Sequence, residues 1–294
     1  MLPRQTINAL REGDEVHGVF ACVRKDRLST RTGSAYLALE LRDRSASIAA
    51  RAFRDADALA GRFERGDLVL VRGRVQRFRD QLVIEVSEIS RAPDEAGDAG
   101  ASEFLPSAYR DLDELDGFLE HLAREVYDPG YRGLLDGLLA DAQLRAQLRR
   151  APCSRAGHHA YLGGLLEHTV AVATLARELC DLHRRLNSDL LLTAAIVHDI
   201  GRVREFTYGA ELGLTDEGRL LGHLAIGAQM LHERAAGTLD QERWLALAHC
   251  VLCHHGPAAA PGGRFASAEA LALYRANALD AAVKGALEQG LALV

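Results

Sequence analysis

The spacing of apolar residues changes near residue 92, and this change most constrains the fold. From Glu12 to Arg91, apolar and polar residues alternate in short runs, whereas beyond Pro106 apolar residues recur every three or four positions. Alternation is typical of a half-buried strand, and the longer spacing is typical of an amphipathic helix. One segment cannot satisfy both periods. The chain therefore predicts an all-β domain followed by an all-α domain.

The first domain is predicted to be a small barrel. Its five alternating runs are 16–23, 35–43, 46–53, 68–78 and 81–89. Between the third and fourth runs, residues 55–67 predict a short helix with Asp55 at its N-cap and Gly66 near the turn into the next strand. Three strands, a helix and two strands match the OB-fold. Another small barrel is the alternative that this pattern leaves open.

The second domain is predicted to be entirely helical. Its apolar-periodic runs are 112–127, 133–148, 163–183, 189–200, 219–234, 242–254 and 268–283. Residues 93–104 are rich in alanine, glycine and acidic residues, which is the composition of a linker. We thus expect a barrel over 1–92, a linker over 93–104 and a helical bundle over 105–294.

Composition indicates the cellular compartment that we expect for this chain. No apolar run approaches the roughly 20 residues that a membrane span needs, and the first residues lack the apolar stretch of a secretory signal. The five cysteines are an odd, unevenly spaced set, so we expect reduced thiols and a cytoplasmic protein without membrane partners. The oligomeric state stays open, with a homo-oligomer among the options.

Charge is distributed unevenly between the two domains. Residues 1–92 carry 17 Lys and Arg against 13 Asp and Glu, a net charge of +4, and the remainder carries 18 against 28, a net charge of −10. A polyanion would therefore meet the barrel more readily than the helical domain.

Single-stranded nucleic acid needs aromatic faces for its bases and cations for its phosphates. The barrel has both: the aromatic candidates are Phe20, Tyr36, Phe53 and Phe78, and the basic candidates are Arg24, Lys25, Arg51, Arg74, Arg77 and Arg79. Aromatic residues in strands often belong to the core, so we expect about half of these aromatics to be buried. The modest charge predicts weak, sequence-tolerant and salt-sensitive binding.

Ten of the twelve histidines lie between His158 and His255. Taken singly, each is expected to be an ordinary core or surface residue. Their order is more informative: His168, the dipeptide His198-Asp199, His223 and the pair His254-His255 are followed by Asn277 and Asp280. Imidazoles and carboxylates bind first-row divalent metals, and a carboxylate can bridge two ions where an imidazole nitrogen cannot. Asp199 is the natural bridge.

This order resembles the HD phosphohydrolase superfamily, in the variant whose extra histidines hold two metals. The segments HHAYLGGLLEHT (158–169), HDIGR (198–202), LTDEGRLLGHLAIG (214–227) and CHHG (253–256) resemble the YhaM-type 3′-5′ exoribonuclease family. That family places an OB-fold before its HD domain, and TGSAYLALELRDRSASIAARAF (32–53) resembles its barrel. The resemblance covers nearly the whole chain.

The resemblance implies two divalent ions, with manganese expected and iron, cobalt, magnesium or zinc as alternatives. It assigns one ion to His168, His198 and Asp199, and the second to Asp199, His223 and His254, with His255 close by. The chain departs from the family pattern at two positions. Asn277 stands where the superfamily has its closing aspartate, and Asp280, one helical turn later, could approach the same face. Arg202 replaces the lysine that usually follows HDIG.

One local string has another interpretation, because residues 250–254 spell C-x-x-C-H, the attachment signature of c-type haem. Haem attachment of that kind occurs outside the reducing cytoplasm, and no export signal is apparent. A single cysteine pair is also insufficient for a structural zinc site. We expect no haem.

A pair of divalent ions can drive phosphodiester hydrolysis without a protein nucleophile. Neither the serine elbow G-x-S-x-G nor a Walker A loop occurs in the sequence. With Asp199 as the catalytic bridge, Arg202, His158 and His159, and also Arg219, are candidates for gripping substrate phosphate or protonating the leaving oxygen.

The leading hypothesis is a metal-dependent exonuclease that draws single-stranded RNA, or DNA, across the barrel and trims its 3′ end. One alternative is an HD phosphohydrolase that acts on a nucleotide or cyclic nucleotide. A second alternative, motivated by Asn277, is a nucleic-acid-binding protein whose metal centre has degenerated.

Overall fold

The computed structural model describes residues 6–30, 32–54, 56–92, 104–209 and 211–288. The chain divides into two compact units: residues 1–106 with 207–213, and residues 107–206 with 214–294. Each unit is described by itself below. The predicted linker lies outside the described residues except for Phe104, and so does the predicted N-cap Asp55.

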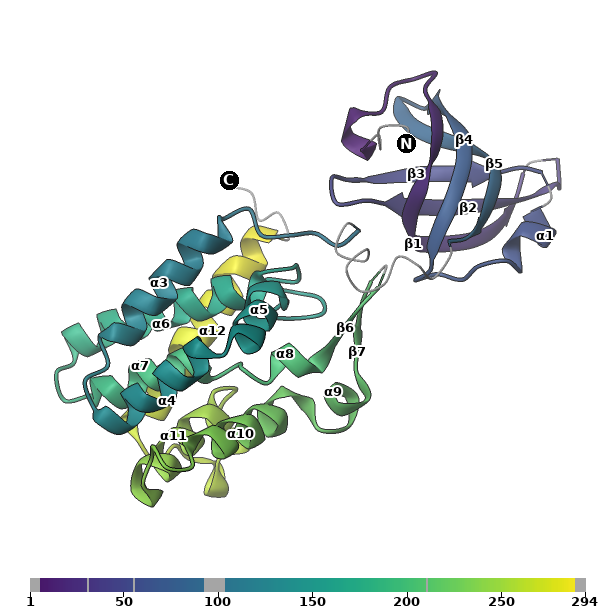
Figure 1. The fold of residues 1–294 in the computed structure, drawn as a ribbon. Coiled ribbons are helices and arrows are strands. Elements are labelled where there is room, and N and C mark those ends of the chain that lie inside the picture. Colours follow the sequence, from purple (N-terminus) through teal and green to yellow (C-terminus); the bar gives the residue numbers. More distant parts are fainter. Residues whose placement is uncertain (1–5, 31, 55, 93–103, 210, 289–294) are drawn as a thin grey trace. The chain divides into compact units, whose positions relative to one another are not determined.

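The first unit is a closed five-stranded barrel (Figure 1). Its strands are β1 (Glu15–Ser29), β2 (Ala35–Arg42), β3 (Ser47–Ala52), β4 (Leu68–Phe78) and β5 (Gln81–Arg91). They pair in the order β1-β2-β3-β5-β4, and β4 pairs with β1 to close the sheet. Only β3 and β5 are parallel. This is the OB-fold topology, so the predicted fold class of this domain is confirmed.

Alternation in the sequence becomes alternation between core and solvent in the barrel. On β2, Leu37, Leu39 and Leu41 are buried, and the residues between them are partly exposed. The predicted helix between the third and fourth strands is α1 (Ala56–Ala60), which buries Ala56 and Leu59. A 3-10 turn, η1 (Ile7–Ala9), precedes β1.

The second unit is helical, as predicted. Its helices are α3 (Leu112–Arg124), α4 (Pro129–Ala140), α5 (Ala142–Arg150), α6 (Gly164–Leu182), α7 (Ser188–Val197), α8 (Arg202–Glu205), α9 (Asp216–Leu220), α10 (Gly222–Ala235), α11 (Gln241–Cys253) and α12 (Ala268–Glu288), with 3-10 turns η3 (Pro257–Ala259) and η4 (Pro261–Gly263). A two-stranded hairpin follows α8 along the chain, with strands β6 (Phe206–Tyr208) and β7 (Leu212–Leu214), and its residues 207–213 belong to the first unit.

Two runs that were each expected to be one helix are divided. Asp141 separates α4 from α5, because its carboxylate accepts hydrogen bonds from the backbone N–H groups of Gln143 and Leu144 and so starts a new helix. Leu221 separates α9 from α10.

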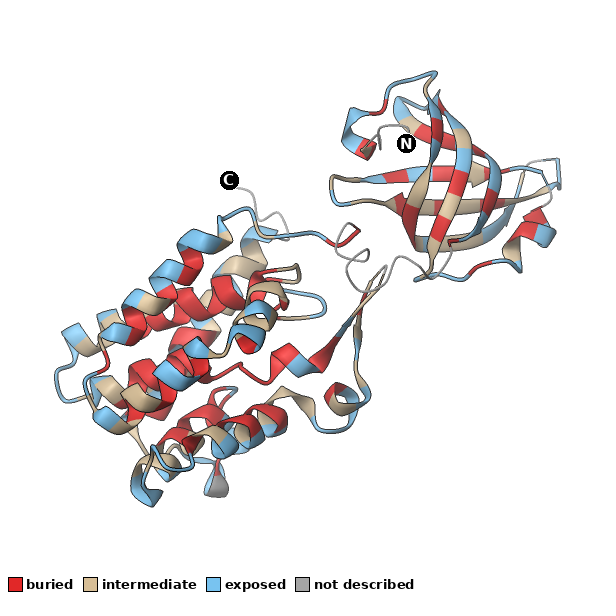
Figure 2. Ribbon diagram, viewed as in Figure 1, coloured by how far each residue is buried: buried red, intermediate tan, exposed pale blue. Residues whose placement is uncertain are grey.

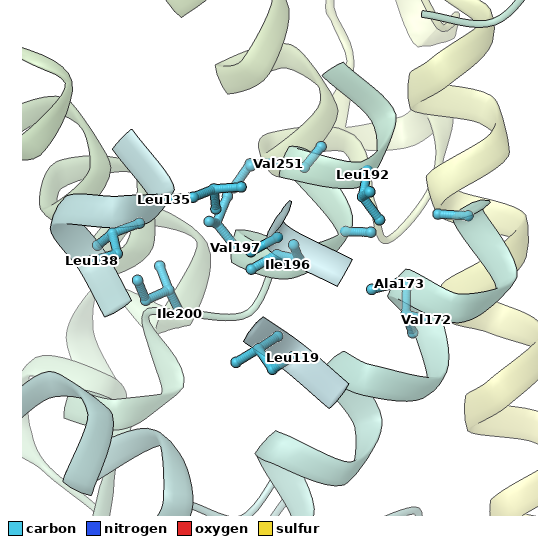
Figure 3. Packing of buried hydrophobic residues seen from close by; sticks show 14 of the residues in the cluster. Leu119, Leu135, Leu138, Val172, Ala173, Leu192, Ile196, Val197, Ile200 and Val251 are labelled. Atoms are coloured by element: carbon cyan, nitrogen blue, oxygen red, sulfur yellow. The ribbon is translucent and has the colours of Figure 1, made fainter. Parts of the chain in front are cut away.

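Helix α7 forms the centre of this unit. Every residue from 190 to 197 is buried (Figure 2), as expected for a helix that is apolar on all sides. Figure 3 shows Ile196 and Val197 packed among Leu119 of α3, Leu135 of α4 and Val251 of α11. The core thus fixes the C-terminal end of α7, where the HD dipeptide follows. Among the described residues, no helix combines the length and apolar character needed to cross a membrane.

Candidate metal centre and nucleic-acid surface

The sequence-predicted histidines come from four helices that meet around the end of α7. His168 lies on α6 and His223 on α10, while His254 directly follows α11. His198 and Asp199 lie in the turn between α7 and α8. His168, His198, Asp199 and His254 are nearly inaccessible to solvent, whereas His223 is partly exposed and His255 is exposed.

The two carboxylate oxygens of Asp199 face two different sets of imidazoles. Oδ1 lies 3.3 Å from His223 Nε2 and 3.4 Å from His254 Nε2. Oδ2 lies 3.7 Å from His198 Nε2 and 3.8 Å from His168 Nε2. One carboxylate therefore stands between two groups of nitrogen donors, as a bridging ligand would.

Hydrogen bonds orient the imidazoles toward Asp199. Nδ1 of His198 lies 2.8 Å from the Ala195 carbonyl, and Nδ1 of His254 lies 2.6 Å from the Val251 carbonyl. Because a carbonyl can only accept, each Nδ1 carries the proton and each Nε2 has a free lone pair when the ring is neutral. Burial, followed by the nearby imidazoles, lowers the pKa of His198 well below its usual value, which favours the neutral ring.

Carboxylates orient two further rings. Nδ1 of His168 lies 2.6 Å from Asp280 Oδ2, and Nδ1 of His223 lies 3.3 Å from Glu205 Oε1. This histidine–carboxylate pairing typically fixes the tautomer of a metal ligand. Asp280 therefore contacts the nitrogen of His168 that points away from Asp199, and it orients this ring.

The donor set fits divalent cations. Asp199 Oδ1 and His254 Nε2 are buried and have no hydrogen-bond partner among the described residues. Nε2 of His168 faces Nε2 of His198 at 3.2 Å, and Nε2 of His223 faces Nε2 of His255 at 2.9 Å. Buried polar atoms without partners are costly, and lone pairs that converge in this way suit a cation.

The ligand atoms form two overlapping groups, each with all its atoms within 4.8 Å of one another. One group contains His168, His198 and Asp199, and the other contains Asp199, His223, His254 and His255. The geometry thus brings together the residues that the sequence assigned to two ions.

Arg202 is buried beside this cluster. Its Nε donates to Asp199 Oδ2 at 2.7 Å, and its Nη1 donates to Glu205 Oε2 at 3.0 Å. Burial alone would raise the pKa of Asp199, but the Arg202 guanidinium and the adjacent imidazoles hold it well below its usual range. In this arrangement Arg202 balances the Asp199 charge, and these two donors are not directed at a substrate.

The other predicted gripping residues lie in different surroundings. His159 is 1% exposed, and its ring nitrogens face Tyr161 Oη at 2.9 Å and Asp280 Oδ2 at 3.0 Å, so neither is free for substrate. This corrects the role expected for His159. His158 is partly exposed, and burial, followed by its histidine neighbours, lowers its pKa to about 4. Arg219 is exposed and paired with Asp216.

Asn277 is buried on α12, and its Nδ2 donates to the His254 carbonyl at 3.3 Å. It thereby supports the segment that carries His254. Asp280, the other candidate ligand on this helix, groups with His159 and His168.

Sequence reasoning missed two buried groups beside the cluster. Glu205 accepts from both the backbone and the ring of His223. Cys153 is fully buried, with Sγ 3.6 Å from Asp199 Oδ2. The only signal for Cys153 was its position shortly before the His158-His159 pair.

A glycine allows α10 to approach the HD turn. A Cβ on Gly201 would lie 2.1 Å from the His223 carbonyl oxygen and 2.5 Å from the Gly227 nitrogen, closer than real contacts permit. Only glycine therefore lets the two backbones pack closely enough to bring His223 to Asp199.

The barrel presents aromatic and cationic groups on its β2–β3 surface and at the β4–β5 turn. Tyr36 and Phe53 stack with their ring centroids 5.3 Å apart. The Arg51 guanidinium lies 4.0 Å from the Phe78 ring centroid, and that of Arg79 lies 5.4 Å from it. Phe53 and Phe78 are 46% and 44% exposed. These are the surface and loop that OB-folds use for oligonucleotides.

Two barrel residues do not fit the predicted role. Phe20 is 4% exposed and packs in the core, so its ring cannot stack on a base. Lys25 Nζ donates to the carbonyls of Ala60 and Phe63 at the end of α1, so it is not free for phosphate. The remaining arginines are exposed: Arg24, Arg74 and Arg77.

Comparison with known proteins agrees with both units. The family model for the HD domain matches residues 165–282, and the model for the OB-fold nucleic acid binding domain matches residues 15–92. The helical unit is an HD domain, and the barrel is an OB-fold. An HD domain implies divalent-metal binding, and the Asp199 cluster lies within the matched range.

Over most of its length this OB–HD chain is similar to proteins named 3′-5′ exoribonuclease YhaM. It is 29% identical to that of Bacillus subtilis over 227 residues, which is 77% of this chain and 71% of the relative. It is 28% identical to that of Oceanobacillus iheyensis, covering 84% of this chain and 77% of the relative, and 28% identical to that of Listeria innocua, covering 76% and 71%. The resemblance inferred from the histidine motifs is confirmed.

Proposed function

We propose that this OB–HD protein is a metal-dependent 3′-5′ exoribonuclease that trims single-stranded RNA, and single-stranded DNA as a second substrate. The observation that carries the proposal is Asp199, whose two oxygens face two separate sets of imidazole nitrogens. The names of its relatives indicate the substrate and the direction of cleavage.

The proposed ligands follow the two groups. His168, His198 and Asp199 would hold one ion, and Asp199, His223, His254 and His255 would hold the other. When bound, a pair of divalent cations supplies Lewis-acid stabilisation of the charge that develops on a phosphodiester and lowers the pKa of a water nucleophile. The family resemblance led us to expect manganese, and imidazole and carboxylate ligands also accept iron, cobalt, zinc and magnesium.

The other residues of the site position these ligands. Asp280 holds His168, and His159 holds Asp280 in turn. Glu205 holds His223 and also binds Arg202. We propose that His159 and Arg202 act through these contacts as positioning residues, and that partly exposed His158 is the predicted gripping residue that substrate can reach.

The barrel would hold the strand that the HD domain trims. We propose that residues 1–92 form the nucleic-acid-binding domain, 93–104 the linker and 105–294 the phosphohydrolase domain. Tyr36, Phe53 and Phe78 would stack on bases, while Arg51 and Arg79 contact phosphates. We also propose a cytoplasmic location, because an enzyme that trims RNA must share a compartment with its substrate.

The test is a ladder assay on single-stranded RNA labelled at its 5′ end, with the full-length protein and manganese. We expect stepwise shortening from the 3′ end, and we expect the double variant H198A/D199A to lose cleavage while retaining RNA binding. His183→Ala, at the exposed end of α6, is the matched control and should cleave normally. Phosphate release from free nucleotides alone would overturn the proposal in favour of a nucleotide phosphohydrolase. Failure to bind any divalent metal would favour a degenerate centre.

A further inference from the structure

We propose that Cys153 is a ligand of the ion assigned to His168, His198 and Asp199, so that this site takes a thiophilic divalent metal, zinc, iron or cobalt, in preference to manganese or magnesium. The inference rests on the proposed function only for the presence of a metal centre.

The position of the thiol carries the inference. Cys153 lies between α5 and α6 and is fully buried, with Sγ 3.6 Å from Asp199 Oδ2 and 3.6 Å from His158 Nε2. The ligand atoms of Cys153, His158 and His168 all lie within 4.8 Å of one another. His168 is thus common to this group and to the His168-His198-Asp199 group, and Cys153 also approaches Asp199 through Oδ2. The Cys153 backbone N–H donates to the His159 carbonyl, which fixes the residue in place.

The three proposed ligands leave this ion room for a further one. His168, His198 and Asp199 supply three ligand atoms. Zinc in proteins takes four ligands, one of which is water in catalytic sites, and it can expand to five. Asn277 carries no negative charge, and its amide nitrogen is bound to the His254 carbonyl. The carboxylate of Asp280 faces the far nitrogen of His168. The Cys153 thiol is therefore the remaining group near Asp199 Oδ2 that can become an anionic ligand.

The chemistry of the bond predicts which metals the site prefers. On binding, the S–H bond breaks, the sulfur–metal bond forms and the proton leaves to solvent. Thiolate sulfur selects softer ions, whereas magnesium and manganese favour oxygen ligands. The opposing interpretation is that Cys153 is only a small buried apolar residue. The two interpretations differ in whether sulfur contacts the metal.

Cobalt is the probe, because its absorption spectrum reports its ligands. The full-length protein is stripped of metal and titrated with Co²⁺. We expect visible d–d bands together with a near-ultraviolet thiolate-to-cobalt charge-transfer band. Cys153→Ser should lose the charge-transfer band and keep the d–d bands. Cys22→Ser is the matched control, because this thiol is equally buried in the barrel, and it should keep both.

Each outcome has one meaning. Visible bands without the charge-transfer band, or a charge-transfer band that survives Cys153→Ser, overturns the inference and leaves the metal centre intact. No cobalt bands in the wild-type protein would instead count against the metal centre. Cys153→Ala guards against misfolding of the serine variant, and circular dichroism verifies both. In competition with a chelating dye, Zn²⁺ affinity should fall at least about tenfold in either variant, since even outer-shell partners contribute that much. Unchanged Zn²⁺ affinity also contradicts the inference.

Discussion

Asp280 offers the sharpest test of how the cluster is positioned. Its Oδ2 lies 2.6 Å from His168 Nδ1 and 3.0 Å from His159 Nε2. Burial would raise the pKa of this carboxyl, but its hydrogen bonds to His159 and His168 hold it far below the usual value, so it accepts as a carboxylate. Asp280→Asn keeps the shape of the side chain but removes the charge of the oxygen that faces both ring nitrogens.

The expected loss follows from that geometry. Deleting a partner of a ligating histidine typically costs 10–100-fold in metal affinity, or about 1.4–2.7 kcal/mol at 1.36 kcal/mol per decade. The shortness of the His168 contact places Asp280→Asn well inside this range and not at its lower end, because a charge-assisted hydrogen bond is roughly twice as strong as a neutral one. We expect manganese affinity to fall about 30-fold and saturating manganese to restore most of the cleavage rate.

The assay is a metal titration of the full-length variant, followed both by direct metal binding and by the RNA ladder. Asp181→Asn is the control, because this exposed carboxylate lies near the end of the same helix that carries His168. Metal affinity within twofold of wild type in Asp280→Asn would refute the positioning role. A loss of cleavage that no manganese concentration restores would show that Asp280 acts in some other way.

Three further predictions concern other parts of the molecule. Phe53→Ala should weaken binding of single-stranded RNA by about 1–3 kcal/mol in a fluorescence titration without changing the melting temperature, because its ring is exposed; unchanged affinity would remove this ring from the interface. Gly201→Ala should lower both melting temperature and metal affinity, because its Cβ would overlap the His223 carbonyl. Gly137→Ala is the control: nothing lies within 4 Å of the added Cβ, so it should stabilise α4 by about 0.5–1 kcal/mol. Equal melting temperatures of the two variants would contradict the close approach at Gly201. Asp128 caps α4 and binds Arg243, whose hydrogen bond lowers the Asp128 pKa. The stability that Asp128 contributes is therefore present above its unfolded pKa of about 3.9 and is lost as pH falls through its folded pKa, so the difference in unfolding free energy between wild type and Asp128→Asn should shrink below pH 4; a constant difference would exclude this linkage.

Much of the fold could be predicted from apolar spacing, and the failures have physical causes. The strands and most helices could be predicted because each buries one apolar face or, in α7, all faces. Spacing did not reveal the break at Asp141, since the apolar pattern continues across it and only the capping carboxylate ends one helix and begins the next. The strands β6 and β7 have three residues each, too few to show a period.

The candidate site was predictable in its ligands but not in their surroundings. Imidazoles and a carboxylate in a fixed order already indicate metal chemistry. Sequence could not place Asp280 behind His168, or Cys153 beside Asp199, because these contacts join elements distant along the chain. The misplacement of Phe20 has a simpler cause. Phe20 lies on the same side of β1 as Val16 and Cys22, and all three are buried in the barrel. Alternation alone does not say which side of a strand faces inward.

The position of the HD dipeptide explains how so polar a cluster can persist inside a helical core. Helix α7 is held on every side by apolar packing, so the turn that follows it has little freedom to carry Asp199 toward water. Asp199 Oδ1 and His254 Nε2 consequently remain buried without partners, an arrangement that costs folding free energy in the absence of a cation. The core thus holds in place ligand atoms that have no partner within the protein. A cation that binds them would offset part of this cost in folding free energy, and the offset would contribute to its affinity.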